Sequence, residues 1–174
     1  LWIYPHSMSY FNEVIGGPTR GADYLLDSNL DWGQDVFYLR RWCEKHPEAR
    51  PLFVLFQNSS SQDLLGIENA GAPPPSSPPA HLEALVDYSA PRALGPIPGW
   101  HAVSVHWIHQ PADRHLYFLR FEPVAMAGYS IYIYHVTLDE ANRVRREIGL
   151  PELRKRVSFR QACIISGGGA ALPW

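Results

Sequence analysis

The sequence predicts a single α/β domain, with a mixed sheet of about four strands, flanking helices and one long Pro/Ser-rich loop. Three observations lead to this prediction. Strand-like runs alternate with helix-like segments, 46% of the residues are hydrophobic, and the chain has 174 residues, which suffices for one core but not comfortably for two. We expect residues 1–151 to form the domain, with 1–22 as its lead-in, and residues 152–174 to form a C-terminal tail.

The first third of the chain has the pattern of a strand, a helix and a strand. DYLL (23–26) has the composition of a short strand, and the apolar spacing becomes helical over about 31–46. PLFVLFQN (51–58) is a short, continuous run of apolar strand formers, which is typical of a buried strand. If the two strands share a sheet and run parallel, their crossover should be right-handed.

The middle of the chain predicts a loop followed by a strand. Residues 59–82 are rich in Ser and Pro, so we expect an exposed loop with one helical turn near 62–65. GWHAVSVHWIHQ (99–110) alternates well enough to predict a strand.

GYSIYIYHV (128–136) has the clearest strand pattern in the chain. One face would carry Ile131, Ile133 and His135, and the other Tyr132, Tyr134 and Val136. The next segment predicts a helix, because Thr137 is followed three residues later by Glu140, the pattern of a capping box. Gly149 and Pro151 indicate where this helix ends.

Composition argues against some classes of function. The formal net charge is −2, which does not indicate an electrostatic attraction to nucleic acid or anionic lipid. Aromatic residues make up 13% of the chain, and such side chains suit cores, sugar-stacking surfaces and membrane-interface belts. No apolar run reaches the roughly 18 residues that a spanning helix needs. The sequence starts with Leu1 rather than Met, so we expect a processed or excised piece of something longer.

The stretch DSNLDWGQD (27–35) is the main candidate for a functional site. Asp27, Asn29 and Asp31 alternate like the first three ligands of an EF-hand calcium loop. The pattern then fails, because the sixth position is Trp32 rather than Gly and the twelfth is Tyr38 rather than Glu. We therefore expect no cofactor, with calcium at the first three residues as an alternative.

Two other interpretations of this stretch stay open. In the first, Asn29 or Asp31 caps a helix that begins between Asn29 and Trp32, and Asp35 lies near the positive end of the helix dipole. In the second, the stretch is a sugar site, because carboxylates and carboxamides pair with hydroxyl groups and an indole face stacks on pyranose C–H groups. The candidate ligand-binding residues are Asp27, Asn29, Asp31, Trp32, Gln34 and Asp35. We favour the cap, with a surface-facing Asp35 or Gln34 as the part that would touch a ligand.

The histidines and cysteines give weaker indications. His101, His106 and His109 lie in or beside one predicted strand, but the first two would point to opposite faces, so a zinc site would need further ligands. Cys43 and Cys163 either form one bridge or remain free thiols. The sequence has no G-x-S-x-G elbow, phosphate loop, H-E-x-x-H or C-x-x-C pattern, so it gives little support for an independent active site.

Two segments resemble a known family. They are YPHSMSYFNEVIGGPTRGADYLLDSNLDWGQDVFYLRRW (4–42) and PVAMAGYSIYIYHV (123–136). Both resemble the region after the last membrane helix of bacterial multi-spanning glycosyltransferases of the family 39 type, which are related to the dolichyl-phosphate-mannose protein mannosyltransferases. The resemblance spans roughly residues 4–136, and the chain departs from it at the Pro/Ser-rich insertion 73–79 and in the tail.

The resemblance implies an extracytoplasmic, membrane-associated domain on the periplasmic face of the bacterial inner membrane. The catalytic acid and the lipid-linked donor of such enzymes lie in the membrane part, so we expect no catalytic residue here and no glycosyl transfer by this chain alone. The implied role is to assist acceptor or glycan binding at the membrane surface, with the membrane-embedded part of the same or another protein, and a glycan or lipid-linked sugar, as partners. The alternative is an accessory subunit that packs on a membrane protein complex without binding sugar. The aromatic residues expected near the bilayer are Trp2, Tyr4, Tyr10 and Phe11.

Overall fold

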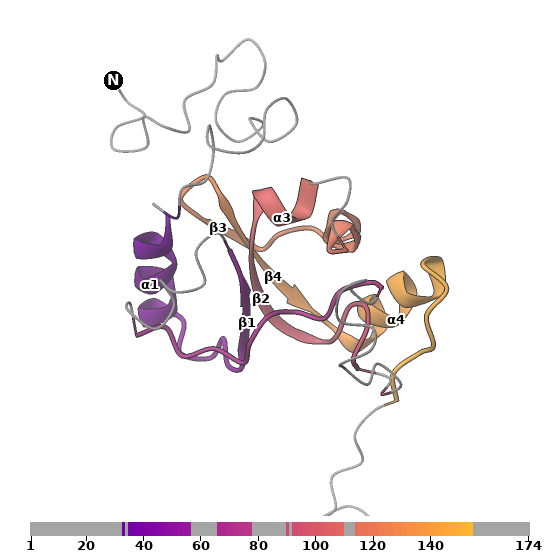
Figure 1. Ribbon diagram of the computed structural model, residues 1–174. Helices are drawn as coiled ribbons and strands as arrows, with labels where there is room; N and C mark the ends of the chain where they lie inside the picture. The colour runs from indigo at the N-terminus through magenta and orange to yellow at the C-terminus, as the bar shows by residue number, and fades with distance from the viewer. Residues whose placement is uncertain are drawn as a thin grey trace, which may run out of the picture.

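The computed structural model describes residues 33, 35–56, 66–77, 90, 92–109 and 114–154 (Figure 1). The elements in chain order are α1 (Val36–Lys45), β1 (Leu52–Leu55), β2 (Gly99–Ser104), α3 (Val105–His109), the 3-10 helix η5 (Leu116–Arg120), β3 (Ala125–Ala127), β4 (Ile131–Val136) and α4 (Leu138–Glu147). The predicted α/β class with a mixed four-stranded sheet is confirmed. Within these residues no helix is both long and apolar enough to cross a membrane.

The sheet has the strand order β1-β2-β4-β3. β1 runs parallel to β2, whereas β4 pairs antiparallel with both β2 and β3. Two positions of the register matter below: Trp100 lies opposite Leu52 on one side and opposite His135 on the other.

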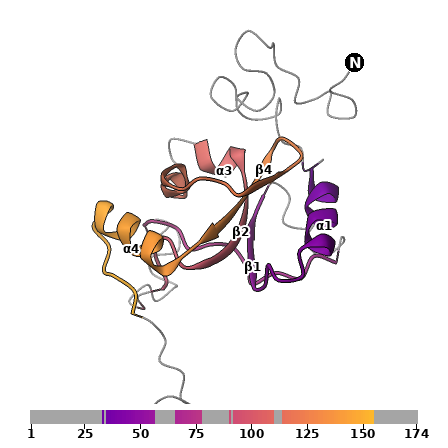
Figure 2. The same cartoon turned by 180° about the vertical axis from the view of Figure 1, so that it is seen from behind.

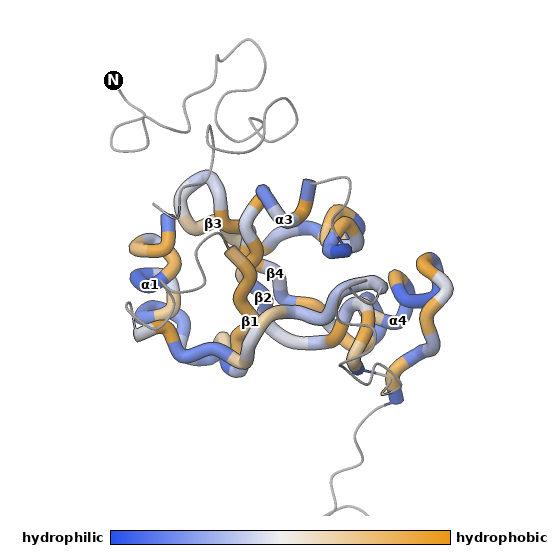
Figure 3. The backbone as a smooth tube through the Cα atoms, viewed as in Figure 1, coloured by the Kyte–Doolittle hydropathy of each residue, from blue (hydrophilic) through white to orange (hydrophobic). Residues whose placement is uncertain are grey.

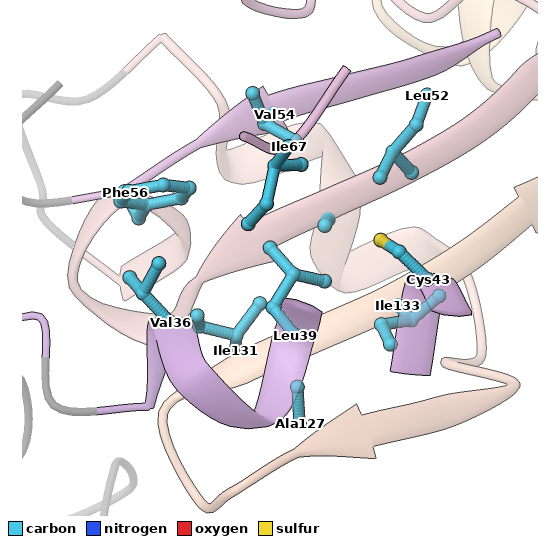
Figure 4. Close-up of a cluster of buried hydrophobic side chains, with 11 residues drawn as sticks. Val36, Leu39, Cys43, Leu52, Val54, Phe56, Ile67, Ala127, Ile131 and Ile133 are labelled. Carbon is cyan, nitrogen blue, oxygen red and sulfur yellow. The ribbon is translucent and has the colours of Figure 1, made fainter. Parts of the chain in front are cut away.

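The sheet separates two hydrophobic clusters. On one face lies α1 alone, and on the other lie α3, η5 and α4, as the front and back views show (Figures 1 and 2). The first cluster joins Val36, Leu39 and Cys43 of α1 to Leu52, Val54, Phe56, Ile67, Ala102, Ala127, Ile131 and Ile133 (Figure 4). The second joins Val103, Ile108, Tyr117, Phe118, Phe121, Tyr134, Val136, Ala141 and Val144. Because neighbouring strand residues enter opposite clusters, both faces of the central strands are buried.

Hydropathy along the chain follows this arrangement. β1 is continuously hydrophobic, whereas hydrophobic and hydrophilic residues alternate along α1 (Figure 3). The predicted faces of β4 are confirmed, since Ile131 and Ile133 enter the first cluster and Tyr134 and Val136 enter the second. A helix that packs on one side has one apolar stripe, whereas a strand that is covered on both faces is apolar along its whole length.

The strand predicted over 99–110 is wrong in its second half. β2 ends at Ser104, and α3 begins at the next residue. Two contacts turn the chain: the Ser104 hydroxyl accepts the His106 N–H at 3.2 Å, and the Val105 N–H donates to the Ser130 carbonyl at 2.8 Å. A serine hydroxyl that takes up a backbone N–H two residues on favours a turn or helix start over a continued strand.

The predicted first helix begins later than expected. α1 starts at Val36, not between Asn29 and Trp32. Gly33 has a φ of 80°, a left-handed conformation that a right-handed helix cannot contain. The Asp35 carbonyl accepts the N–H groups of Tyr38 and Leu39, so the first helical bonds begin at Asp35.

The last helix follows the sequence pattern closely. Thr137 Oγ1 accepts the Glu140 N–H at 3.3 Å, and Glu140 Oε2 accepts the Thr137 N–H at 2.9 Å, so the predicted capping box is confirmed. Inside α4, Arg145 is buried and its guanidinium donates to three backbone carbonyls, those of Leu94, Pro96 and Pro151. This side chain fastens the connections before β2 and after α4 to the helix.

Several expectations lie outside the described residues. They are the strand at 23–26, the helical turn at 62–65, the tail beyond residue 154, and the side chains of Trp2, Tyr4, Tyr10 and Phe11. The described part of the Pro/Ser-rich segment, 66–77, contains neither helix nor strand.

Candidate functional site

Asp35 is the one member of the 27–35 stretch whose candidate side chain the structure describes. It is 0% exposed, so the expectation of a surface-facing Asp35 is wrong. Its Oδ2 accepts the backbone N–H groups of Tyr129 at 2.8 Å and Ser130 at 2.9 Å, in the turn between β3 and β4. A carboxylate that accepts two backbone N–H groups is a strong, charge-assisted link. Asp35 therefore has a structural role and lies too deep to touch a ligand.

The carboxylate of Asp35 does not cap its own helix. It occupies the N-cap position of α1 but makes no side-chain hydrogen bond to the first turn. The reason is geometric, because the same oxygen reaches across to the β3–β4 turn instead. Whether Asn29 or Asp31 makes a cap, as the sequence predicts, falls outside the described residues, as do Asp27, Trp32 and Gln34.

Gly128 and Asp35 form a matched pair. Gly128 has a φ of 63° and its Cα faces the Asp35 carboxylate so closely that an added Cβ would overlap all three carboxylate atoms. Only glycine meets both demands at once, a left-handed backbone and no side chain. The two segments that carry the family resemblance, 4–42 and 123–136, thus meet at this contact, although Asp35 and Tyr129 are 94 residues apart in sequence.

The three histidines considered for zinc do not form a site. His101 is buried in β2, with its ring between Phe53 and Phe118 and its Nε2 2.9 Å from the Ile97 carbonyl oxygen. Burial lowers the pKa of His101 to about 4, so the ring is neutral at physiological pH. His106 and His109 belong to α3. Among the described side chains no group of three or more His, Cys, Asp or Glu is placed to hold a metal ion.

A row of four rings lies on the α1 side of the sheet, and we call it the aromatic row. From one end to the other it consists of His46, Trp42, Trp100 and His135. Each imidazole stacks on its neighbouring indole at a centroid distance of 4.4 Å, and the two indoles are 5.7 Å apart. Both tryptophans are half-buried against the first cluster, while His135 is exposed. The row is therefore partly exposed, with His135 at its open end.

Two open cavities share Arg50 as a lining residue. The first, of about 190 Å³, is lined by Arg50, Pro51, Leu52, Glu68, Asn69 and Ala70. The second, of about 220 Å³, is lined by Arg40, Cys43, Glu44, Arg50, Gly66 and Ile67. Leu52, which lines the first cavity, is the register partner of Trp100, so this cavity lies one strand away from the Trp100 backbone. Both are smaller than the roughly 300–1,000 Å³ of drug-sized sites, so each suits a small group such as one sugar ring.

The cavities carry charges of both signs. Arg50 lies 3.7 Å from Glu68, whose side chain is 85% exposed, and Arg40 pairs with Glu44 at 3.1 Å. Such exposed pairs exchange partners at little cost, so they can donate to and accept from the hydroxyl groups of a ligand. Cys43 is not a candidate nucleophile, because burial raises the pKa of its thiol against the opposing effect of Arg50. Cys163, its possible bridge partner, lies outside the described residues.

Sequence reasoning missed the aromatic row for a definable reason. Trp42 and His46 are four apart in one helix, a spacing that places them on one face. Trp100 and His135 become neighbours only through the register of β2 and β4, which no local pattern reveals. The contact between Trp100 and His135 can be predicted only when the pairing of β2 and β4 is known.

The comparisons with known proteins give no family. No family model, curated protein or solved structure matches this chain.

Proposed function

We propose that this chain is the non-catalytic extracytoplasmic domain of a membrane-bound, glycosyltransferase-like protein, and that it assists acceptor or glycan binding at the membrane surface. The location and the parent protein rest on the resemblance of residues 4–42 and 123–136. The glycan-binding role is carried by one observation, the aromatic row on the α1 face of the sheet, whose Trp100 is the register partner of Leu52 in the cavity lined by Arg50 and Glu68.

The chemistry of this surface suits sugars. A pyranose has an apolar C–H face and a rim of hydroxyl groups, so it favours an aromatic surface next to side chains that both donate and accept. Trp42 and Trp100 supply the first, and Arg50 and Glu68 supply the second. The two kinds of group are connected through the Leu52–Trp100 register pair, in which Leu52 lines the cavity and Trp100 belongs to the row.

This proposal changes which residues are expected to touch the glycan. Asp35 is no longer a candidate glycan-binding residue, because its carboxylate is buried and bound to the β3–β4 turn. The remaining residues of the stretch, Asp27, Asn29, Asp31, Trp32 and Gln34, keep the sequence-based hypothesis that they contact sugar, whereas the N-cap position of α1 belongs to Asp35.

The test is a titration of the purified chain with a panel of neutral, amino and acidic oligosaccharides, followed by calorimetry and by tryptophan fluorescence. We expect at least one sugar to bind, and Trp100→Phe to weaken that binding about tenfold, which corresponds to about 1.4 kcal/mol. Glu68→Gln should weaken it too, without loss of stability, because this carboxylate is largely exposed. We also expect no turnover of a lipid-linked sugar by the chain alone.

The matched control is Trp107→Phe. Trp107 is also half-buried, but it packs against the second cluster on the other face of the sheet. Among the described residues its Nε1 finds no acceptor, so the change to Phe strands no partner. Equal loss of binding in the two tryptophan variants, or no binding of any sugar by the folded chain, would exclude the glycan-binding role.

The alternative is an interaction module that packs on a membrane protein complex and binds no sugar. One observation favours it: Phe37, in the first turn of α1, is 62% exposed. Aromatic side chains are enriched at protein interfaces, so Phe37 is the residue of α1 that such a contact would bury. Under this alternative, Phe37→Ser would leave the stability of the chain unchanged and weaken its association with a membrane-embedded partner.

A further inference from the structure

The 3-10 helix η5 exposes two leucines on one face. Leu116 is 38% exposed and Leu119 is 54% exposed, whereas the two residues between them, Tyr117 and Phe118, are buried in the second cluster. A 3-10 helix has three residues per turn, so positions three apart lie directly above one another. The two leucines therefore form one small apolar patch that points away from the core.

Arginines surround this pair. Arg114 lies two residues before η5, Arg120 is its last residue, and Arg143 of α4 donates to the Arg120 carbonyl at 3.0 Å. Arg120 and Arg143 share a single carboxylate, that of Glu147, at 2.8 and 3.1 Å. The three guanidinium groups of Arg114, Arg120 and Arg143 outnumber the two carboxylates of Glu147 and the exposed Glu122, which leaves a local excess of positive charge that the net charge of −2 for the whole chain conceals.

The patch is small for a protein interface. A stable dimer or complex buries roughly 1,200–2,000 Å² in total, far more than two half-exposed leucines supply. Binding to a bilayer needs no complementary protein surface of that size, because individual leucine side chains can enter the membrane–water interface and the lipid phosphates attract arginine. Apolar side chains with arginines beside them are complementary to the boundary between anionic headgroups and acyl chains.

We propose that η5 is a lipid-docking surface, in which Leu116 and Leu119 enter the edge of an anionic bilayer and Arg114 and Arg120 contact headgroup phosphates. η5 is the short coil beside α3 (Figures 1 and 2), and α3 begins where β2 ends. Phe118 of η5 packs against the ring of His101, on the face of the sheet opposite α1, whereas the aromatic row lies on the α1 face. Docking through η5 therefore leaves the aromatic row on the face that is turned away from the bilayer.

The test is co-sedimentation of the full chain with vesicles of phosphatidylethanolamine and phosphatidylglycerol, compared with vesicles of phosphatidylcholine. We expect the chain to bind the anionic vesicles only. The Leu116→Ser, Leu119→Ser double variant should bind them roughly thirtyfold more weakly, since each leucine has about half its surface left to bury. Arg114→Gln should weaken binding by about fivefold, and added salt should remove that difference.

The matched control is Phe37→Ser, which removes an exposed apolar side chain from α1 on the opposite face of the sheet. Its binding to the vesicles should equal that of the unchanged chain, and all variants should keep their melting temperatures. Three results would each overturn the proposal: no sedimentation with anionic vesicles, binding that survives the double substitution, or equal loss in the Phe37→Ser control. Concentration-dependent self-association without lipid that the double substitution abolishes would assign the patch to a second copy of the chain instead. Vesicle binding should be unaffected by Trp100→Phe, so this test stands apart from the glycan titration.

Discussion

The contact between Asp35 and Gly128 permits a quantitative prediction. Asp35→Ala removes the acceptor of two backbone N–H groups, those of Tyr129 and Ser130, at a site where the carboxylate is fully buried. Each stranded buried donor costs about 1–3 kcal/mol. We therefore expect Asp35→Ala to lower the free energy of unfolding by roughly 2–5 kcal/mol, a large share of the 5–15 kcal/mol that holds a typical domain together.

Gly128→Ala should be costly for the same reason. The left-handed backbone at Gly128, with a φ of 63°, penalises any side chain by about 1–2 kcal/mol. The added methyl group also overlaps the Asp35 carboxylate and drives it from its two donors. With Ala at position 35 this overlap disappears and only the backbone penalty remains. The sum of the unfolding free energies lost in the two single variants should thus exceed the loss in the double variant by about 2–4 kcal/mol.

The assay is urea unfolding of the four proteins of this cycle, followed by tryptophan fluorescence. A control cycle pairs Asp35→Ala with Gly149→Ala, because Gly149 also has a positive φ, 77°, but open space around its Cα. Here we expect additivity within about 0.5 kcal/mol. Additive costs in the Gly128 cycle as well would refute the inference that the two residues are matched.

Three further predictions concern the rest of the core. His101 has a folded-state pKa of about 4 against an ordinary 6.5, so the unfolded chain binds the proton more readily. The contribution of His101 to the free energy of unfolding should therefore be constant above pH 6.5 and fall by about 3 kcal/mol between pH 6.5 and 4. Urea unfolding across this range should show that His101→Phe lacks this part of the loss. Thr137→Ala removes one side of the capping box and should cost about 1 kcal/mol in thermal unfolding, whereas an exposed neighbour, Asp139→Ala, should cost less than half of that. Arg145→Met keeps most of the buried volume but strands three carbonyls, so it should cost roughly 2–4 kcal/mol in urea unfolding, and an unchanged midpoint would show that this guanidinium does not fasten the loops.

The parts of the fold that the sequence could predict are those that depend on neighbouring residues. The alternation of Ile131 to Val136 and the Thr137–Glu140 box are local patterns, and both elements are confirmed. β1 is likewise a continuous apolar run, as a strand with two covered faces should be. β3 was not predicted, because its three residues, Ala-Met-Ala, carry no strand pattern of their own and pair only because β4 lies beside them.

The remaining differences arise from contacts between distant residues. β2 stops at Ser104 partly because the Ser130 carbonyl takes up the next N–H group. Asp35 is buried because its partners come from the β3–β4 turn, whereas its local sequence suits an exposed helix start. The aromatic row depends on strand register in the same way. Composition and spacing carry no information about such pairings, so the sequence suggested a surface-facing Asp35 and did not indicate the aromatic row.

The bond between Asp35 and the β3–β4 turn also has a consequence for the order in which the chain folds. Its partners are 94 and 95 residues further on, and the apolar face of α1 packs on Ala127, Ile131 and Ile133 from the same late region. Contacts of such high sequence separation form slowly, because a long loop must close before they stabilise anything. During synthesis, the apolar face of α1 therefore stays in water until residues 127–133 have emerged, and this interval is when the nascent protein is most open to aggregation.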